Sequence, residues 1–179
     1  MEAFTKHVGL LAALDRANVD TDQIIPKQFL KSVRRTGFGE ALFFDWRYRP
    51  DGTDDPAFPL NAPRFNGATI LVVRNNFGCG SSREHAVWAA RQYGFRALIA
   101  PGRGTGVERV PGFADIFRNN AIKNGLLPVE LDEEKCQQIG EAGEAKIDLE
   151  SQTVSWNGGE AGFEIDAEIK RRLLGGLDD

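Results

Sequence analysis

A strand pattern, a glycine-rich turn and a helix pattern follow one another between residues 68 and 93. Residues 68–74 are apolar and β-branched, and residues 76–85 read Asn-Phe-Gly-Cys-Gly-Ser-Ser-Arg-Glu-His. The spacing after them predicts a helix over residues 82–93, and a second apolar run at residues 96–100 completes a βαβ unit with parallel strands. Glycines let the backbone approach a ligand, and free N–H groups at a helix start attract anions. The pattern therefore predicts an α/β protein with an anion site at this turn.

The same signals predict the remaining elements. We expect strands at residues 7–14, 126–131, 146–150, 153–156 and 163–165, and helices at residues 26–34, 113–123, 133–140 and from Asp166 to near Gly176. The irregular segment 36–66 is long enough to be a functional or covering segment. Residues 101–112 are rich in glycine, and we expect them to be mobile. Because no repeat or linker is visible, residues 1–179 are expected to form a single domain.

Composition excludes several classes of function. The net charge of −4 gives no electrostatic reason to expect nucleic acid as a partner. No apolar run is long enough to cross a bilayer and no signal peptide is visible, so we expect a cytoplasmic protein without membrane contact. An iron–sulfur cluster normally needs about four thiolates, and a zinc site needs about three or four ligands. With two cysteines and two histidines, the chain offers no metal site of its own.

Residues 78–85 resemble the signature of the swivelling domain of the aconitase superfamily. Three further stretches, 18–26, 35–46 and 113–128, resemble the bacterial 3-isopropylmalate dehydratase small subunits in the same order along the chain. Two departures stand out. Residues 101–112 are an insertion where the family has a short junction, with Gly112 in place of a helix-capping serine, and the chain ends sooner at Asp179 than the family pattern does.

The resemblance implies a swivelling β/β/α domain, with a parallel-rich central sheet, flanking helices and a small β appendage over residues 145–165. It implies a hydro-lyase of leucine biosynthesis that isomerises 2-isopropylmalate to 3-isopropylmalate through 2-isopropylmaleate. In this family the partner large subunit carries a [4Fe–4S] cluster, whose open iron is a Lewis acid for the departing hydroxyl. The chain is then expected to be inactive alone and to work in a heterodimer or higher assembly on a small dicarboxylate.

Ser81 and Arg83 match the family's catalytic base and its substrate-carboxylate ligand. A serine can act as a base only where backbone N–H groups, a helix N-terminus or a cation stabilise its alkoxide. The spacing of Ser81 and Glu84 by itself favours a helix-capping box instead, with Ser82 as another possible cap. Arg83 suits a carboxylate, because a guanidinium forms two parallel hydrogen bonds with it. The alternative for Arg83 is a solvated side chain in the first helical turn.

The resemblance also assigns roles at the edge of the site. Asp22 matches a catalytic position that orients groups near the cluster, and Thr21 and Ser82 match substrate-binding positions. A turn before Pro26 explains Asp22 and Thr21 equally well. Leu30 and Val33 lie in the segment that discriminates substrates in the family, where they would meet an isopropyl group; the alternative is simple packing.

Other functions remain open at this point. A sister enzyme acting on homoaconitate, citraconate or methylmalate has the same motifs, and a non-catalytic anion-binding module would keep the same turn. His85 lies one turn from Ser81, which allows a Ser–His hydrolase, although a histidine packed in the helix explains the spacing better. We interpret Cys79 as a small space-filling residue rather than a nucleophile.

Overall fold

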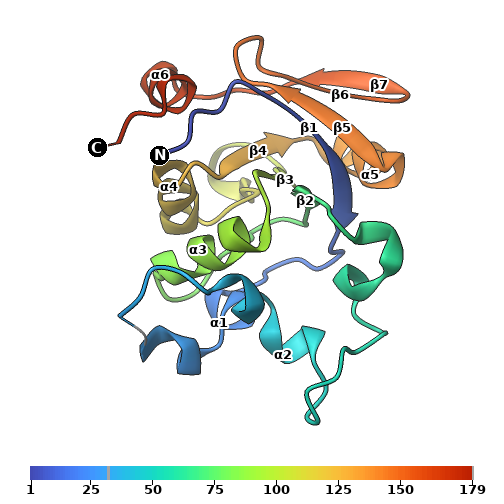
Figure 1. Ribbon diagram of the computed structural model, residues 1–179. Helices are drawn as coiled ribbons and strands as arrows, with labels where there is room; N and C mark the ends of the chain where they lie inside the picture. The colour runs from blue at the N-terminus through green and yellow to red at the C-terminus, as the bar shows by residue number, and fades with distance from the viewer. Residues whose placement is uncertain (32, 179) are drawn as a thin grey trace.

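Strand β1 (Lys6–Ala13) joins a parallel sheet to an antiparallel one in this computed structural model, which describes residues 1–31 and 33–178 (Figure 1). Residues 11–13 of β1 pair in parallel with β2 (Ile70–Val72). β2 in turn pairs in parallel with β3 (Ala97–Pro101), and β3 with β4 (Leu127–Leu131). Residues 6–10 of β1 pair antiparallel with β5 (Glu144–Asp148), followed by β6 (Thr153–Trp156) and β7 (Gly159–Gly162). The strand order is β4-β3-β2-β1-β5-β6-β7. The α/β fold with its β appendage is confirmed.

Alternate residues of the parallel strands face two separate hydrophobic cores. Leu71 and Leu98 face the first core, which is covered by α3 (Glu84–Tyr93) and α4 (Asp115–Lys123). Ile70 and Ile99 face the second core, which is covered by α5 (Glu133–Ala142), α6 (Ala167–Gly175) and the antiparallel strands. Strands buried on both faces are typical of parallel sheets, because crossover helices lie on either side.

The long segment 36–66 covers the first core. It contains the short helix α2 (Phe44–Arg47) and the 3₁₀ turns η2 (Gly39–Ala41), η3 (Pro59–Asn61) and η4 (Pro63–Phe65). Its apolar side chains are buried against the parallel sheet and α3: Phe38, Leu42, Phe43, Phe58 and Leu60. The segment is therefore a packed cover rather than a free loop.

Two predicted elements are wrong. The helix expected at residues 26–34 is the 3₁₀ turn η1 (Lys27–Lys31), which has no fully buried residue and only Phe29 and Leu30 packed partly against the core. Residue 32 of the expected helix lies outside the described residues. The strand expected at residues 163–165 is instead β7, four residues earlier. The backbone N–H of Phe163 donates to the Gln152 carbonyl at 2.9 Å, and the side-chain Nε2 of Gln152 donates to the Phe163 carbonyl at 2.9 Å. The turn Asn157-Gly158, a strong hairpin signal, marks the true start of β7.

The glycine-rich segment 101–112 is tied down rather than free. Arg103 and Val110 exchange backbone hydrogen bonds of 2.8 and 2.7 Å around the turn η5 (Gly106–Glu108). Arg103 also forms an ion pair with Glu133 of α5 at 3.1 Å. These contacts hold the segment against the end of the parallel sheet, and its expected mobility stays a prediction.

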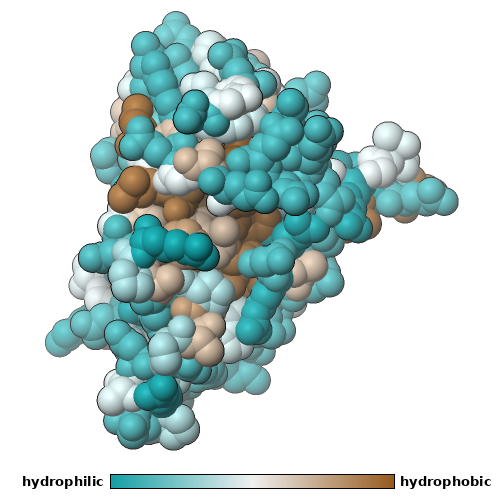
Figure 2. All heavy atoms as spheres, turned by 90° about the vertical axis from the view of Figure 1, so that its right-hand side faces the viewer, coloured by the Kyte–Doolittle hydropathy of each residue, from teal (hydrophilic) through white to brown (hydrophobic). Residues whose placement is uncertain are grey.

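The surface is mostly hydrophilic, and Figure 2 shows one face on which apolar atoms gather in a central hollow. In the described part of the chain, the exposed large apolar side chains are those of Val8, Leu10, Val33, Val107, Ile116 and Leu177. None of the helices described has both the length and the apolar character that crossing a bilayer requires. The two chain ends meet beside α6, where the Met1 amino group donates to the Asp178 carboxylate at 2.7 Å (Figure 1).

Candidate active site

The turn after β2 folds as the glycine positions predicted, with three residues in left-handed conformations. Asn76, Gly78 and Gly80 have φ angles of 58°, 85° and 91°. At Gly78 an added Cβ would lie 2.2 Å from Cγ of Phe117, so only glycine permits this turn to rest on α4. The backbone N–H of Gly78 donates to the Val19 carbonyl at 2.8 Å, which anchors the turn to the segment after β1.

Helix α1 (Thr21–Ile24) fixes the other side of the turn. Asp20 caps this helix and exchanges hydrogen bonds with Gln23 in a capping box. The Thr21 N–H donates to the Cys79 carbonyl at 2.9 Å, and its Oγ1 donates to the Ser81 carbonyl at 2.7 Å. Thr21 is only 3% exposed, so its hydroxyl proton is committed to holding the backbone of Ser81 in place.

The turn and the first residues of α4 enclose a pocket of about 290 Å³. Its lining residues are Thr21, Gly78, Gly80, Ser81, Ser82, Arg83, Ala114, Asp115, Ile116 and Phe117. Ser81 and Ser82 are exposed, and within the described chain the Ser81 hydroxyl has no hydrogen-bond partner. The structure therefore brings together four of the predicted site residues: both serines, Arg83 and Thr21.

Asp22 reaches the site through Arg83. The Arg83 guanidinium contacts the Asp22 carboxylate in a short ion pair, with the arginine side chain 15% exposed and the aspartate side chain 51% exposed. A guanidinium has five N–H donors, so this pair leaves donors free for a second carboxylate. Asp22 thus orients the arginine from the rim and is not among the pocket-lining residues.

The helix ends nearby are not capped as the spacing predicted. Helix α3 begins at Glu84 with Arg83 at the N-cap position, and no side chain of the described residues caps it. The Glu84 carboxylate instead accepts a hydrogen bond from Asn124 Nδ2 at 3.0 Å, so the capping box of Ser81 and Glu84 is wrong. Helix α4 also lacks a side-chain cap among these residues, and its first turn lines the pocket. Uncapped N–H groups at a helix start favour an anion in this pocket.

Leu30 and Val33 lie away from the pocket. Leu30 is half-buried and packs against the first core, and Val33 is 99% exposed. Neither side chain lines the pocket, so their contact with a substrate stays a prediction.

His85 and Cys79 have structural environments. The His85 ring packs against Trp88 and Phe38, with centroid distances of 4.7 and 5.5 Å, and has no hydrogen bond to Ser81 in the described chain. Burial, and then the nearby Asp20 carboxylate, raise the pKa of the Cys79 thiol. Both effects disfavour the thiolate that a nucleophile or metal ligand requires. Among residues 1–31 and 33–178, no three or more histidine, cysteine or acidic side chains are arranged so that they could hold a metal ion.

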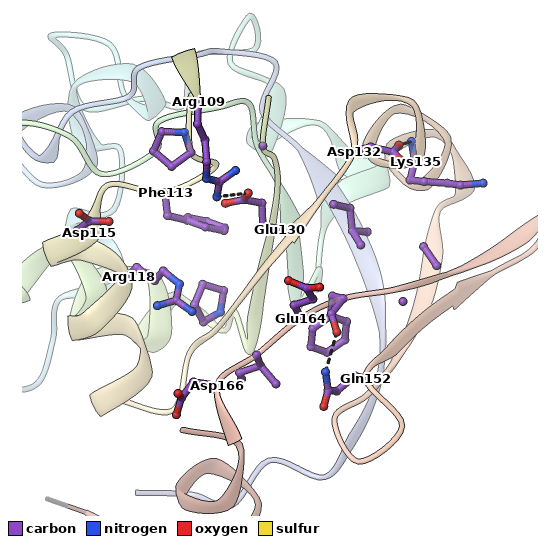
Figure 3. Close-up of a pocket in the computed structure, with 18 residues that line it drawn as sticks. Arg109, Phe113, Asp115, Arg118, Glu130, Asp132, Lys135, Gln152, Glu164 and Asp166 are labelled. Atoms are coloured by element: carbon purple, nitrogen blue, oxygen red, sulfur yellow. Dashed lines mark hydrogen bonds and ion pairs between the residues drawn. The ribbon is translucent and has the colours of Figure 1, made fainter. Parts of the chain in front are cut away.

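A larger groove of about 1070 Å³ lies on the other side of Asp115, between β4, α4 and the segment after β7 (Figure 3). Its charged side chains have both signs, and Arg109 and Glu130 pair with each other there. The residues that line it include no serine, threonine, histidine or cysteine. Of the two, only the smaller pocket is lined by hydroxyl side chains, and it holds the predicted residues Ser81, Ser82 and Arg83.

The sequence motifs did not predict that residues 114–117 form one wall of the pocket. A signal for it exists, because the segments after β1, β2 and β3 all leave from the carboxyl ends of adjacent parallel strands. Ligand sites in such sheets form at that edge. The α4 motif follows β3, so its first turn meets the turn that follows β2.

Comparison with known proteins identifies the family of the chain. Residues 1–134 match the family model of the aconitase C-terminal domain. The 3-isopropylmalate dehydratase small subunit of Halalkalibacterium halodurans is 54% identical, covering 100% of this chain and 90% of that protein. The corresponding subunit of Desulforapulum autotrophicum is 51% identical, covering 100% and 88%.

The fold is also similar to a solved structure. The crystal structure of 3-isopropylmalate dehydratase from Methanocaldococcus jannaschii has a TM-score of 0.68 at 26% identity, covering 97% of this chain and 90% of that one. Sequence and fold thus agree that this chain belongs to the 3-isopropylmalate dehydratase small subunits, within the aconitase C-terminal domain family.

Proposed function

We propose that this chain supplies the base and a carboxylate-binding arginine to a cytoplasmic hydro-lyase that a large subunit completes. The reaction is the reversible removal and return of water that converts 2-isopropylmalate to 3-isopropylmalate, a step of leucine biosynthesis. The observation that carries the proposal is the shared pocket of Ser81 and Arg83, opposite the uncapped start of α4.

Ser81 is the proposed base. Its hydroxyl is exposed in the pocket and free of partners in the described chain, so it can accept a proton from substrate once it is an alkoxide. Free N–H groups at the start of α4 and the Arg83 guanidinium are the groups of this chain that would stabilise that negative charge. Fixed donors in a site closed to water have a much larger effect than donors in bulk solvent. The hydrogen bond from Thr21 to the Ser81 carbonyl holds the residue in position.

Arg83 is the proposed ligand of a substrate carboxylate. Asp22 holds the guanidinium at the pocket, and the remaining N–H donors suit the planar, two-point geometry of a carboxylate. Ser82 is the second exposed hydroxyl of the pocket and is proposed to donate to the same substrate.

The partner is proposed to be the large subunit, with the [4Fe–4S] cluster as its cofactor. This chain offers no ligand set for a cluster among its described residues, and its two thiols have raised pKa values. The cluster does not fit this chain, and when bound on the partner it would supply a Lewis acid for the substrate hydroxyl. The exposed side of the Ser81 pocket is where such a partner must sit.

Reconstitution tests this function. The chain is mixed with a cluster-loaded 3-isopropylmalate dehydratase large subunit, and the absorbance of 2-isopropylmaleate is followed. We expect turnover from the pair and none from either chain alone. A substrate panel separates the sister enzymes: a pair that acts on homoaconitate or citraconate but not on isopropylmalate would contradict the proposed substrate.

A further inference from the structure

The carboxylate of Glu84, the first residue of α3, is held by Asn124 at the end of α4. Asn124 Nδ2 donates to Glu84 Oε1 at 3.0 Å and to the Asn120 carbonyl at 2.8 Å. Both side chains of the pair are half-buried, and within residues 1–31 and 33–178 the Glu84 carboxylate has no second hydrogen bond or ion pair. Asn124 is thus the residue that decides where this carboxylate lies.

The same carboxylate has a competing partner three residues earlier, because Ser81 and Glu84 have the spacing of a capping box. In a capping box, the Glu84 N–H would donate to the Ser81 hydroxyl, and the Ser81 N–H would donate to the Glu84 carboxylate. The structure does not form this box. Helix α3 begins at Glu84, and the N–H groups of Ser81 and Glu84 have no partner in the described chain. A carboxylate drawn toward Asn124 is not available to the Ser81 N–H.

Formation of the capping box would impair the site of the proposed function. The box would turn the Ser81 hydroxyl toward the helix and place the Glu84 carboxylate beside it. A neighbouring negative charge disfavours the alkoxide that a serine base requires. It would also oppose the binding of a substrate carboxylate to Arg83. The contact between Glu84 and Asn124 avoids both effects.

We propose that Asn124 is a positioning residue, which keeps Ser81 available as the base by holding the Glu84 carboxylate away from it. This inference rests on the proposed function and goes beyond it, because it assigns a role to a residue at the far end of α4, outside the pocket lining. Asn124 acts through Glu84. The effect of removing Asn124 should therefore depend on whether Glu84 is present.

A double-mutant cycle tests this dependence. Hydration of 2-isopropylmaleate with saturating large subunit is measured for Asn124→Ala, Glu84→Ala and the double variant. We expect Asn124→Ala to lower kcat by about ten-fold, Glu84→Ala to change it by less than about three-fold, and the double variant to recover most of the loss. The double variant also lacks the Asn124 bond to Asn120, so recovery cannot come from that bond. Asn119 is exposed on the same helix with no side-chain hydrogen bond in the described chain, and Asn119→Ala should keep the wild-type kcat.

Amide hydrogen exchange of the isolated chain tests the structural step without any activity. We expect the Ser81 amide proton to exchange more slowly in Asn124→Ala, because it becomes a donor to Glu84, and to return to the wild-type rate in the double variant. An unchanged Ser81 rate in Asn124→Ala, or a double variant that turns over as slowly as Asn124→Ala, overturns the inference. If the wild-type pair does not hydrate 2-isopropylmaleate while the exchange rates change as expected, the proposed function fails and the control of Glu84 by Asn124 stands.

Discussion

Arg83 is already oriented by Asp22 before any substrate binds. We expect Asp22→Asn to raise KM several-fold, because the guanidinium loses the group that positions it. Stability should change by no more than about 1 kcal/mol, since exposed ion pairs contribute about 0–1 kcal/mol. Steady-state kinetics of the assembled enzyme and urea unfolding of the chain measure the two effects. A large loss of kcat at constant KM would show that Asp22 acts in the chemical step instead.

Gly78 is the residue on which the geometry of the turn depends. Gly78→Ala should lower the free energy of unfolding by about 2–4 kcal/mol, because it adds a clash with the Phe117 ring to the left-handed strain. Gly67 is a matched control, with a similar φ of 80° and no atom within 4 Å of an added Cβ. Gly67→Ala should cost only about 1 kcal/mol. Equal urea midpoints for the two variants would show that the contact with Phe117 does not constrain the turn.

Helix α5 contains a buried thiol, Cys136, which should make the free energy of unfolding fall as the pH becomes alkaline. Burial, and then the Asp132 carboxylate, raise the pKa of Cys136 from its ordinary value of 9.0 to about 12. Above about pH 9 the unfolded chain loses this proton and the folded chain keeps it, so the group stabilises the fold fully below pH 9 and progressively less up to about pH 12. The loss should approach about 1.4 kcal/mol per pH unit. Comparing urea unfolding of the wild type and Cys136→Ala from pH 8 to pH 10.5 isolates this slope, which the variant should lack.

At the scale of elements, local patterns predicted most of the fold. The βαβ unit, the glycine turn, α4, α5 and the Asp166 cap of α6 follow from periodicity and capping residues that act locally. The errors occur where tertiary contacts decide. η1 has no fully buried residue, and β7 is set by the Asn157-Gly158 turn and by the hydrogen bonds between Phe163 and Gln152. The ion pairs that hold residues 101–112 to α5 and β4 join distant segments, which no local pattern reveals.

The candidate site was predictable only on its turn side. The residue types and spacing of the motif 78–85 are enough to predict a site there. The ion pair between Asp22 and Arg83 and the hydrogen bond from Thr21 to Ser81 depend on how the segments after β1 and β2 meet in the fold. Ile116 has no distinctive neighbours in sequence. Its place opposite Ser81 follows from the strand order, which puts the start of α4 beside the turn.

At the scale of the whole molecule, the proposed active centre lies on the surface of the chain, and in the proposed function a second chain supplies its other half. Ser81 and Ser82 of the pocket are exposed, and relatives more than half identical over this whole chain are named small subunits. Catalysis should therefore require a second chain that covers the pocket.

Ser81→Ala in the assembled enzyme tests this account most directly, with Ser82→Ala as the matched control from the same turn. Hydration of 2-isopropylmaleate and binding of the large subunit are measured for both. We expect Ser81→Ala to lower turnover by about 10²–10⁴-fold with unchanged binding of the large subunit, and Ser82→Ala to have a much smaller effect on kcat. Turnover of Ser81→Ala within a few-fold of the wild type would contradict the assignment of Ser81 as the base.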